Sequence, residues 1–246
     1  MRKSVSYPTD SENASEGQRA LAAAALERSA WFGVCRPATR ESLLSQGHLR
    51  VMQRGEVLSR QGSSVEHLCL LIDGSLAVST TTKTGKRHVV RYLEPGQLMN
   101  LVPVLDEQPA IHDAAAHTTS LVLLMHHTQI QEALETEPAL AKALMRLLCL
   151  RARLAYDGIS GSTLLPLGQR CAIALLQLAE PYGLPREEGL AISLKLSQDE
   201  FADMVGCSRP MANRELKQLE AKGIIRTTYS HFVILDPTSL RAIAGA

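Results

Sequence analysis

Glycine recurs at regular intervals through the first half of the chain, and this series limits the fold more than any other feature. Gly55, Gly62, Gly74, Gly85 and Gly96 are separated by 7, 12, 11 and 11 residues. Short apolar runs lie between them, as expected for short strands joined by tight turns. The series therefore predicts an antiparallel sandwich or barrel from about Leu49 to His127.

The pattern of individual segments within this region predicts strands. The run LCLLIDGSLAVSTTT predicts two strands joined as a hairpin at Asp73–Gly74. HVVRYL and SLVLLMHH predict further strands, and a helix is expected earlier, from Gln18 to Trp31. Aromatic residues make up only 4% of the chain, so aliphatic side chains must supply the core. Residues 1 to about 18 are polar and predict a mobile arm.

After His127 the pattern becomes helical. TQIQEALETEP predicts a short helix, and Pro138 starts a longer one with apolar residues at spacings of three and four. Such a stripe either packs on its own chain or pairs two chains in a coiled coil, and we expect the dimer. The expected interface residues are Leu140, Leu144, Leu147, Arg151 and Leu154. A hinge is expected to break this helix at Asp157–Gly161.

The C-terminal segment LSQDEFADMVGCSRPMANRELKQLEAKGII predicts two helices joined by a short turn. Ser197 stands three residues before Glu200, the spacing of a capping box. Gly206 permits the turn, and Ser208 is expected to cap the second helix. That helix ends at Gly223, as expected of a glycine just past a helix. This order of signals indicates a helix-turn-helix.

The second of these helices is basic. Between Arg209 and Arg226 there are five basic and two acidic residues, so the segment carries a net charge of 5 − 2 = +3, against +1 for the whole chain. A local positive face on a helix that fits a major groove indicates DNA binding. Near the helix start, an arginine can donate two hydrogen bonds to guanine.

A hairpin wing is expected after the basic helix, in IIRTTYSHFVIL, with its tip around Tyr229–His231. The alternative is an ordinary helical subdomain with a solvated basic face. The cap, glycine turn, basic face and wing occur in order, and together they favour DNA. The expected DNA-binding residues are Ser197, Ser208, Arg209, Pro210, Asn213, Arg214 and Lys217.

These motifs together resemble the Crp/Fnr family of bacterial transcription regulators. LSQDEFADMVGCSRPMANRELKQLEAKGII is similar to the family's winged helix-turn-helix, and EPALAKALMRLLCLRARL to its dimerisation helix. The glycine series resembles its cyclic-nucleotide-binding-type jelly roll. The resemblance implies a dimer that reads a palindromic operator in double-stranded DNA, with RNA polymerase as a further partner. Arg209 and Arg214 match base-reading arginines, whereas Pro210 replaces a base-reading glutamate, so the operator should differ.

The resemblance also bears on the effector. Cyclic-AMP-binding members hold the ribose with a glutamate and the phosphate with an Arg-Ser pair; the matching residues here are Leu101, Ile111 and His112. Ala155 and Tyr156 replace a Thr-Ser pair that contacts the base. Leu101 and Ile111 cannot hold a buried phosphate. We therefore expect a degenerate pocket of Leu101, Ile111, His112 and Tyr156 that does not bind cyclic AMP in the usual way.

The residue types present limit which other cofactors the chain could bind. The five cysteines are scattered and only Cys35 lies near the N-terminus, which excludes the family's four-cysteine iron–sulfur cluster. Haem stays an alternative because histidines are present, although His126 and His127 would point to opposite faces of a strand. The other reading is that these histidines are exposed or satisfied in the core. A different effector, or regulation without any ligand, also stays open. The candidate histidines are His88, His112, His117, His126 and His127.

The chain shows no Walker loop, GxSxG, HExxH or plausible carboxylate pair, so an enzyme is not expected. It has no long apolar run and no secretion signal, so we expect a cytoplasmic protein without membrane contact. The expected fold is α+β: an antiparallel β jelly roll, a long dimerisation helix and a winged helix-turn-helix. The expected domains are residues 1–30 (arm and helix), 31–136 (sensory jelly roll), 137–160 (dimerisation helix and hinge) and 161–246 (DNA-binding domain).

Overall fold

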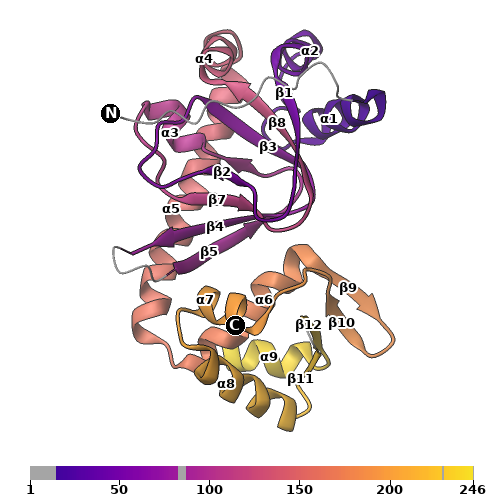
Figure 1. Ribbon diagram of the computed structural model, residues 1–246, viewed down its shortest axis with the longest axis vertical. Coiled ribbons are helices and arrows are strands. Elements are labelled where there is room, and N and C mark those ends of the chain that lie inside the picture. Colours follow the sequence, from indigo (N-terminus) through magenta and orange to yellow (C-terminus); the bar gives the residue numbers. More distant parts are fainter. Residues whose placement is uncertain (1–14, 83–86, 229, 246) are drawn as a thin grey trace. The chain divides into compact units, whose positions relative to one another are not determined.

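The computed structural model describes residues 15–82, 87–228 and 230–245. The chain divides into two compact units, Met1–Arg151 and Ala152–Ala246 (Figure 1). Most of the predicted polar arm, the turn at Gly85 and the wing-tip residue Tyr229 lie outside the described residues. The boundary between the units falls inside the long helix, before the boundary expected after residue 160.

The first unit is built around two four-stranded antiparallel sheets, which confirms the antiparallel β architecture. Its strands are β1 (His48–Met52), β2 (Val57–Ser59), β3 (His67–Asp73), β4 (Leu76–Thr81), β5 (Arg87–Leu93), β6 (Leu98–Met99), β7 (Asp113–Ala116) and β8 (Ser120–His126). Its helices are α1 (Glu16–Arg28), α2 (Pro37–Gln46), α3 (Leu101–Asp106) and α4 (His127–Thr136), followed by α5 (Pro138–Leu164), which continues into the second unit. One sheet has the order β1-β8-β3-β6 and the other β2-β7-β4-β5.

Two apolar clusters hold this unit together. Neighbouring residues of β3 enter different clusters because successive residues of a strand point to opposite faces. Leu71 of β3 packs between the sheets with Val78 and Ala114. Its neighbour Leu70 faces the other way, toward the helices, where Leu26 of α1 lies in the same cluster. Both faces of the sheet β1-β8-β3-β6 are therefore buried.

The hairpin predicted at Asp73–Gly74 is wrong. β3 and β4 follow one another in the chain but belong to different sheets: β3 pairs with β8 and β6, and β4 with β5 and β7. Gly74 has φ +87°, and a Cβ there would lie 2.5 Å from the Ser120 hydroxyl and the Thr119 carbonyl oxygen. The turn thus crosses from one sheet to the other, close to the start of β8.

The hinge predicted at Asp157–Gly161 is also wrong, because α5 runs from Pro138 to Leu164. Four of the five residues expected in the dimer interface contact the first unit of their own chain instead. Leu140, Leu144 and Leu147 are at most 6% exposed and belong to the first unit's own core. Arg151, on the same side of the helix, donates from Nη2 to the Leu98 carbonyl at 2.5 Å. The alternative reading, a helix packed on its own chain, is the correct one for this face.

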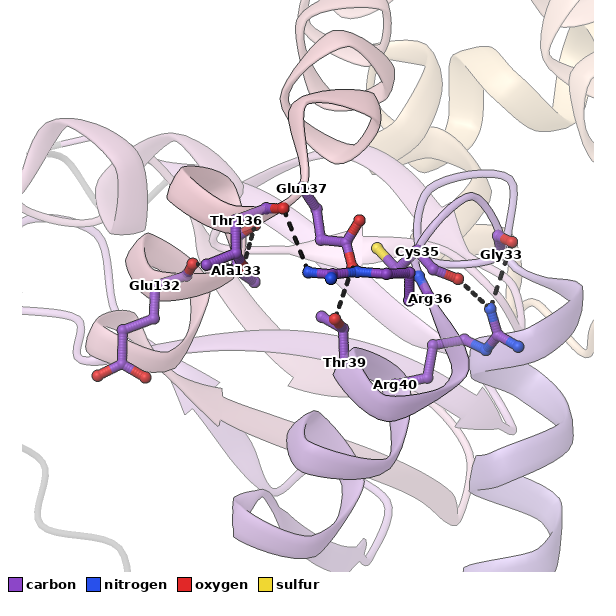
Figure 2. A network of polar contacts seen from close by, with 9 residues as sticks. All are labelled: Gly33, Cys35, Arg36, Thr39, Arg40, Glu132, Ala133, Thr136 and Glu137. Carbon is purple, nitrogen blue, oxygen red and sulfur yellow. Dashed lines mark hydrogen bonds and ion pairs between the residues drawn. The ribbon is translucent and has the colours of Figure 1, made fainter.

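Glu137 ties the junction of α4 and α5 to the start of α2 (Figure 2). Its Oε1 accepts from the Thr39 hydroxyl at 2.6 Å, from Arg36 Nε at 2.9 Å and from the Arg36 backbone N–H at 3.2 Å. These donors, Thr39 first, hold the pKa of Glu137 at about 2. This network anchors the start of α5 and was not foreseen from the sequence.

The second unit contains α6 (Leu167–Tyr182), β9 (Gly183–Arg186), β10 (Gly189–Ile192), α7 (Gln198–Val205), α8 (Arg209–Ala221), β11 (Ile225–Thr228), β12 (His231–Ile234) and α9 (Pro237–Ala244). Its sheet has the order β11-β12-β10-β9. α6 packs against α9, α8 and α7. In the described part of the chain, no helix is both long and apolar enough to span a membrane.

Candidate nucleic-acid interface

The first helix of the predicted helix-turn-helix is α7, and its start matches the sequence prediction. The Ser197 hydroxyl accepts from the Glu200 N–H at 3.2 Å, and the Glu200 carboxylate accepts from the Ser197 N–H at 2.8 Å. Ser197 also donates its hydroxyl to Glu200 at 2.9 Å. The expected DNA-binding hydroxyl of Ser197 is therefore engaged in capping α7. Phe201 and Val205 bury the opposite side of the helix.

The turn between α7 and α8 is built on Gly206, which has φ +75°. Ser208 is the N-cap of α8 as predicted, but its side chain makes no capping hydrogen bond. Pro210 lies in the first turn, where a helix needs no N–H from it. Met211 is 45% exposed, and Ala212 fills the core position. The exposed start of α8 thus carries Ser208, Pro210 and Met211.

The basic face predicted for α8 is exposed, but acidic side chains accompany it. Arg209 Nη1 lies 3.2 Å from Asp199 of α7, and Arg214 Nη2 lies 3.1 Å from Glu215. Both guanidinium groups are more than half exposed. Surface pairs of this kind contribute only about 0.2–1 kcal/mol each. Phosphates or base edges can therefore replace Asp199 and Glu215 at small cost.

The other predicted contacts on α8 differ in how accessible they are. Lys217 is exposed. Asn213 is half-buried, and its Oδ1 is buried without a hydrogen-bond partner. Arg226, at the start of the wing, pairs with Glu188 from the turn between β9 and β10. Asp199 and Glu188 lie outside the basic segment in sequence, so the +3 charge of that segment overstates the positive charge of the surface.

The predicted wing forms the hairpin of β11 and β12, and one contact ties it to the helix. The Glu220 carboxylate near the end of α8 accepts from the Thr227 N–H at 2.6 Å and from its hydroxyl at 2.5 Å. Gly223, with φ +69°, makes the turn between them. The wing is therefore held directly to the helix that carries the basic face, a link that the sequence analysis missed.

The expected effector-pocket residues do not share one environment. Leu101 at the start of α3 is 1% exposed and part of the core, whereas Ile111 is 47% exposed. His112 is half-buried. Tyr156 on α5 is 72% exposed and belongs to the second unit. None of the four residues supplies a permanent cation for a phosphate.

The histidines considered for haem are arranged differently from the prediction. His126 ends β8 and His127 begins α4, so they do not alternate on one strand. Their ring centroids lie 4.3 Å apart, and the ring of His67 lies 5.2 Å from that of His126. Among the residues that the structure describes, no group of three or more His, Cys, Asp and Glu side chains is arranged to hold a metal ion.

Family models match both halves of the chain. Residues 49–137 match the cyclic nucleotide-binding domain, and residues 169–243 match the Crp-like helix-turn-helix domain. The first match covers the two sheets of the first unit through α4. The second covers α6 to α9, including the basic helix and the wing.

Several proteins that are similar to this chain are transcription regulators. A CRP-like cAMP-activated global transcriptional regulator of Mycobacterium tuberculosis is 23% identical over 87% of this chain and 96% of its own length. The cAMP-activated global transcriptional regulator CRP of Salmonella typhimurium is 26% identical over 76% and 89%. Among solved structures, FixK2 from Bradyrhizobium japonicum has a TM-score of 0.73 at 18% identity, covering 81% of this chain and 98% of its own.

Proposed function

Because the chain belongs to the Crp/Fnr family of transcription regulators, we propose that it binds a palindromic operator in double-stranded DNA as a homodimer. The recognition helix is α8, which enters the major groove. RNA polymerase is the further partner that the family suggests. Because the target is chromosomal DNA, the protein acts in the bacterial cytoplasm.

The observation that carries this proposal is the exposed basic start of α8 beside a wing. Arg209, Arg214 and Lys217 are all exposed, on a helix whose other side packs through Leu216 and Leu219. Arginines near a helix start can donate two hydrogen bonds to guanine O6 and N7. Lys217 suits a phosphate, which it would neutralise as a point charge. Arg226 at the start of the wing is a further partly exposed cation, and it pairs with Glu188.

A stripe of α5 residues supports the dimer, although it is not the stripe predicted from the sequence. Met145, Cys149, Ala152 and Tyr156 are exposed and recur at spacings of four, three and four. Residues so spaced share one face of a helix, as in a coiled coil. Met145 is 58% and Tyr156 72% exposed, so this face of α5 is open to a second chain. We propose that the same stripe of a second chain covers this one.

Leu154, the one expected interface residue that is exposed, lies on a different face of α5. It is 54% exposed and follows Leu150, 50% exposed, by four residues. At 100° per residue, this pair is turned well away from Met145 and Tyr156. Leu154 is therefore left outside the proposed interface.

A symmetric dimer through α5 would give α8 a partner related by a two-fold axis. Helix-turn-helix dimers of this kind contact half-sites about 34 Å apart, one turn of DNA.

The sensory unit is proposed not to bind cyclic AMP in the usual way, because Leu101 and Ile111 offer no charge to a cyclic phosphate.

DNA binding can be tested by fluorescence anisotropy with a random-sequence duplex over a range of salt concentrations. The wild type should bind, with an affinity that falls steeply as salt rises. Lys217→Ala should reduce the salt slope by about 1. Arg241→Ala on α9 removes the same charge from the same unit and should leave the slope unchanged. Equal effects of both variants on the salt slope, or an affinity that does not change with salt concentration, would contradict the proposal that this face of α8 binds DNA.

A further inference from the structure

Two exposed apolar residues, Pro210 and Met211, lie in the first turn of α8. Met211 is 45% exposed, and Pro210 is exposed as well. Neither side chain donates a hydrogen bond, and the sulfur of methionine is only a weak acceptor. Pro210 also lacks a backbone N–H, so it removes one of the donors that the start of a helix leaves free. These two residues can therefore recognise a ligand only through apolar contact.

The helical period places Pro210 on the most exposed side of α8. Ala212, Leu216 and Leu219 are buried and define the side that packs against the rest of the unit. At about 100° per residue, Pro210 lies almost directly opposite that buried side, and so does Arg214 one turn later. In a helix-turn-helix, the first residues of the second helix are those that contact base edges. Pro210 therefore stands where α8 would meet a base.

Met211 widens this apolar surface along one flank of the helix. It is turned about 60° from Arg214 and lies three residues before it, so the two side chains are neighbours. The opposite flank holds Arg209, whose Nη1 lies 3.2 Å from Asp199 of α7. The exposed side of α8 thus begins with the apolar pair Pro210–Met211 and continues with the guanidinium of Arg214.

The major-groove edges of the four bases differ in what an apolar side chain can contact. Guanine, adenine and cytosine present hydrogen-bonding groups there, whereas thymine also presents its C5 methyl group. An apolar side chain pressed against a hydrogen-bonding edge displaces water without replacing its hydrogen bonds, which is costly. Against a methyl group, the same side chain gains the burial of apolar surface. The pair Pro210–Met211 therefore favours thymine over the other three bases.

We propose that Pro210 and Met211 recognise thymine in each half-site of the operator by contacting its C5 methyl group. This inference rests on the proposed function and deepens it, because it names the base that the start of α8 selects. Four residues of a helix rise about 6 Å, and successive base pairs are about 3.4 Å apart. The thymine should therefore lie about one or two base pairs from the guanine that Arg214 contacts.

Replacement of single thymines by uracil tests this contact, because uracil keeps the pairing and the O4 acceptor of thymine and lacks only the methyl group. The starting duplex is the one most enriched from a random library by the full chain, and each thymine is replaced in turn. Loss of one buried methyl group should weaken binding about fourfold, and loss of the equivalent group in both half-sites about fifteenfold. Fluorescence anisotropy measures these dissociation constants. Thymines outside the half-sites should tolerate uracil.

A double variant tests whether Pro210 and Met211 make the contact. The measured quantity is the ratio of the dissociation constants for the uracil and the thymine duplex. Pro210→Ser combined with Met211→Gln should bring this ratio close to one. Lys217→Ala is the matched control on the same helix: it removes a proposed phosphate contact, so it should weaken binding to both duplexes equally and keep the wild-type ratio. All three side chains are exposed, so these variants should fold as the wild type does.

The outcomes separate this inference from the proposal that α8 binds DNA. An enriched half-site without thymine beside the guanine would overturn the recognition of thymine and leave DNA binding in place. The same holds if every uracil duplex binds with wild-type affinity, or if the double variant keeps the wild-type ratio. The absence of any enriched duplex would overturn both proposals together.

Discussion

Leu144 and Met145 are neighbours on α5, but Leu144 is buried and Met145 is exposed. A substitution of Leu144 should therefore destabilise the fold, whereas a substitution of Met145 should weaken the dimer. Leu144 is 2% exposed in the core of the first unit. Leu144→Ala removes buried methyl groups and leaves a cavity, which costs about 2–5 kcal/mol. At about 2–4 °C per kcal/mol for a chain of this size, the melting temperature should fall by about 4–20 °C. Thermal unfolding followed by circular dichroism measures this.

Met145 is 58% exposed, so Met145→Glu should change the stability of an isolated chain by no more than about 0.5 kcal/mol. In the proposed dimer, however, it places a carboxylate from each chain in an apolar interface. Burying charges without partners costs several kcal/mol, so the dimer should dissociate about a hundredfold more readily. Sedimentation equilibrium at micromolar concentrations measures the dissociation constant directly.

Leu150→Glu is the matched control, because Leu150 is 50% exposed on a different face of the same helix. It should leave the dimer intact. The reasoning is refuted if Met145→Glu sediments as the wild type does, or if Leu150→Glu dissociates the dimer equally. It also fails if Leu144→Ala unfolds at the wild-type temperature, since Leu144 would then not be a core residue.

Three further variants test single contacts. Asp199→Asn frees Arg209 from its acidic partner and should raise affinity for duplex DNA about two- to fivefold by anisotropy; weaker binding would mean that Asp199 positions Arg209 for DNA. Glu220→Ala removes the acceptor of the Thr227 N–H, so hydrogen exchange at that amide should speed up and DNA affinity should fall, whereas unchanged exchange would show that the wing does not depend on this bond. The pKa of Glu137 is about 2 in the fold against an ordinary 4.5, so its charge stabilises the fold above about pH 4.5 and this contribution is lost as the pH falls toward 2. Glu137→Gln should therefore lower the melting temperature at neutral pH and flatten its decline in acid, an effect that Glu135→Gln, at an exposed residue, should not reproduce.

The DNA-binding unit was largely predictable because its signals are local. The capping box of Ser197 and Glu200 and the turn at Gly206 depend on residues only a few positions apart. Their geometry follows from the backbone at those positions, whatever the rest of the chain does. The acidic partner Asp199 of Arg209 was missed because a count within the basic segment does not show which neighbouring element approaches it.

The wrong predictions share a physical cause. A sequence pattern shows which side of an element is apolar or where a turn lies, but not which part of the chain packs against it. The spacing of Leu140, Leu144 and Leu147 indicates an apolar side of α5, and the chain's own core covers that side. Asp73–Gly74 has the composition of a hairpin turn, but the pairing of β3 with β8 was decided by residues some 50 positions away.

The central claim is that two copies of α8 read one operator. Selection of bound duplexes from a random library, followed by sequencing, tests it most directly. We predict enrichment of an inverted repeat whose half-sites are centred about one helical turn, or 10 base pairs, apart. Arg214→Ala should relax the preference at the same position in both halves. A single unrepeated half-site, or no enrichment over the starting library, would contradict the claim.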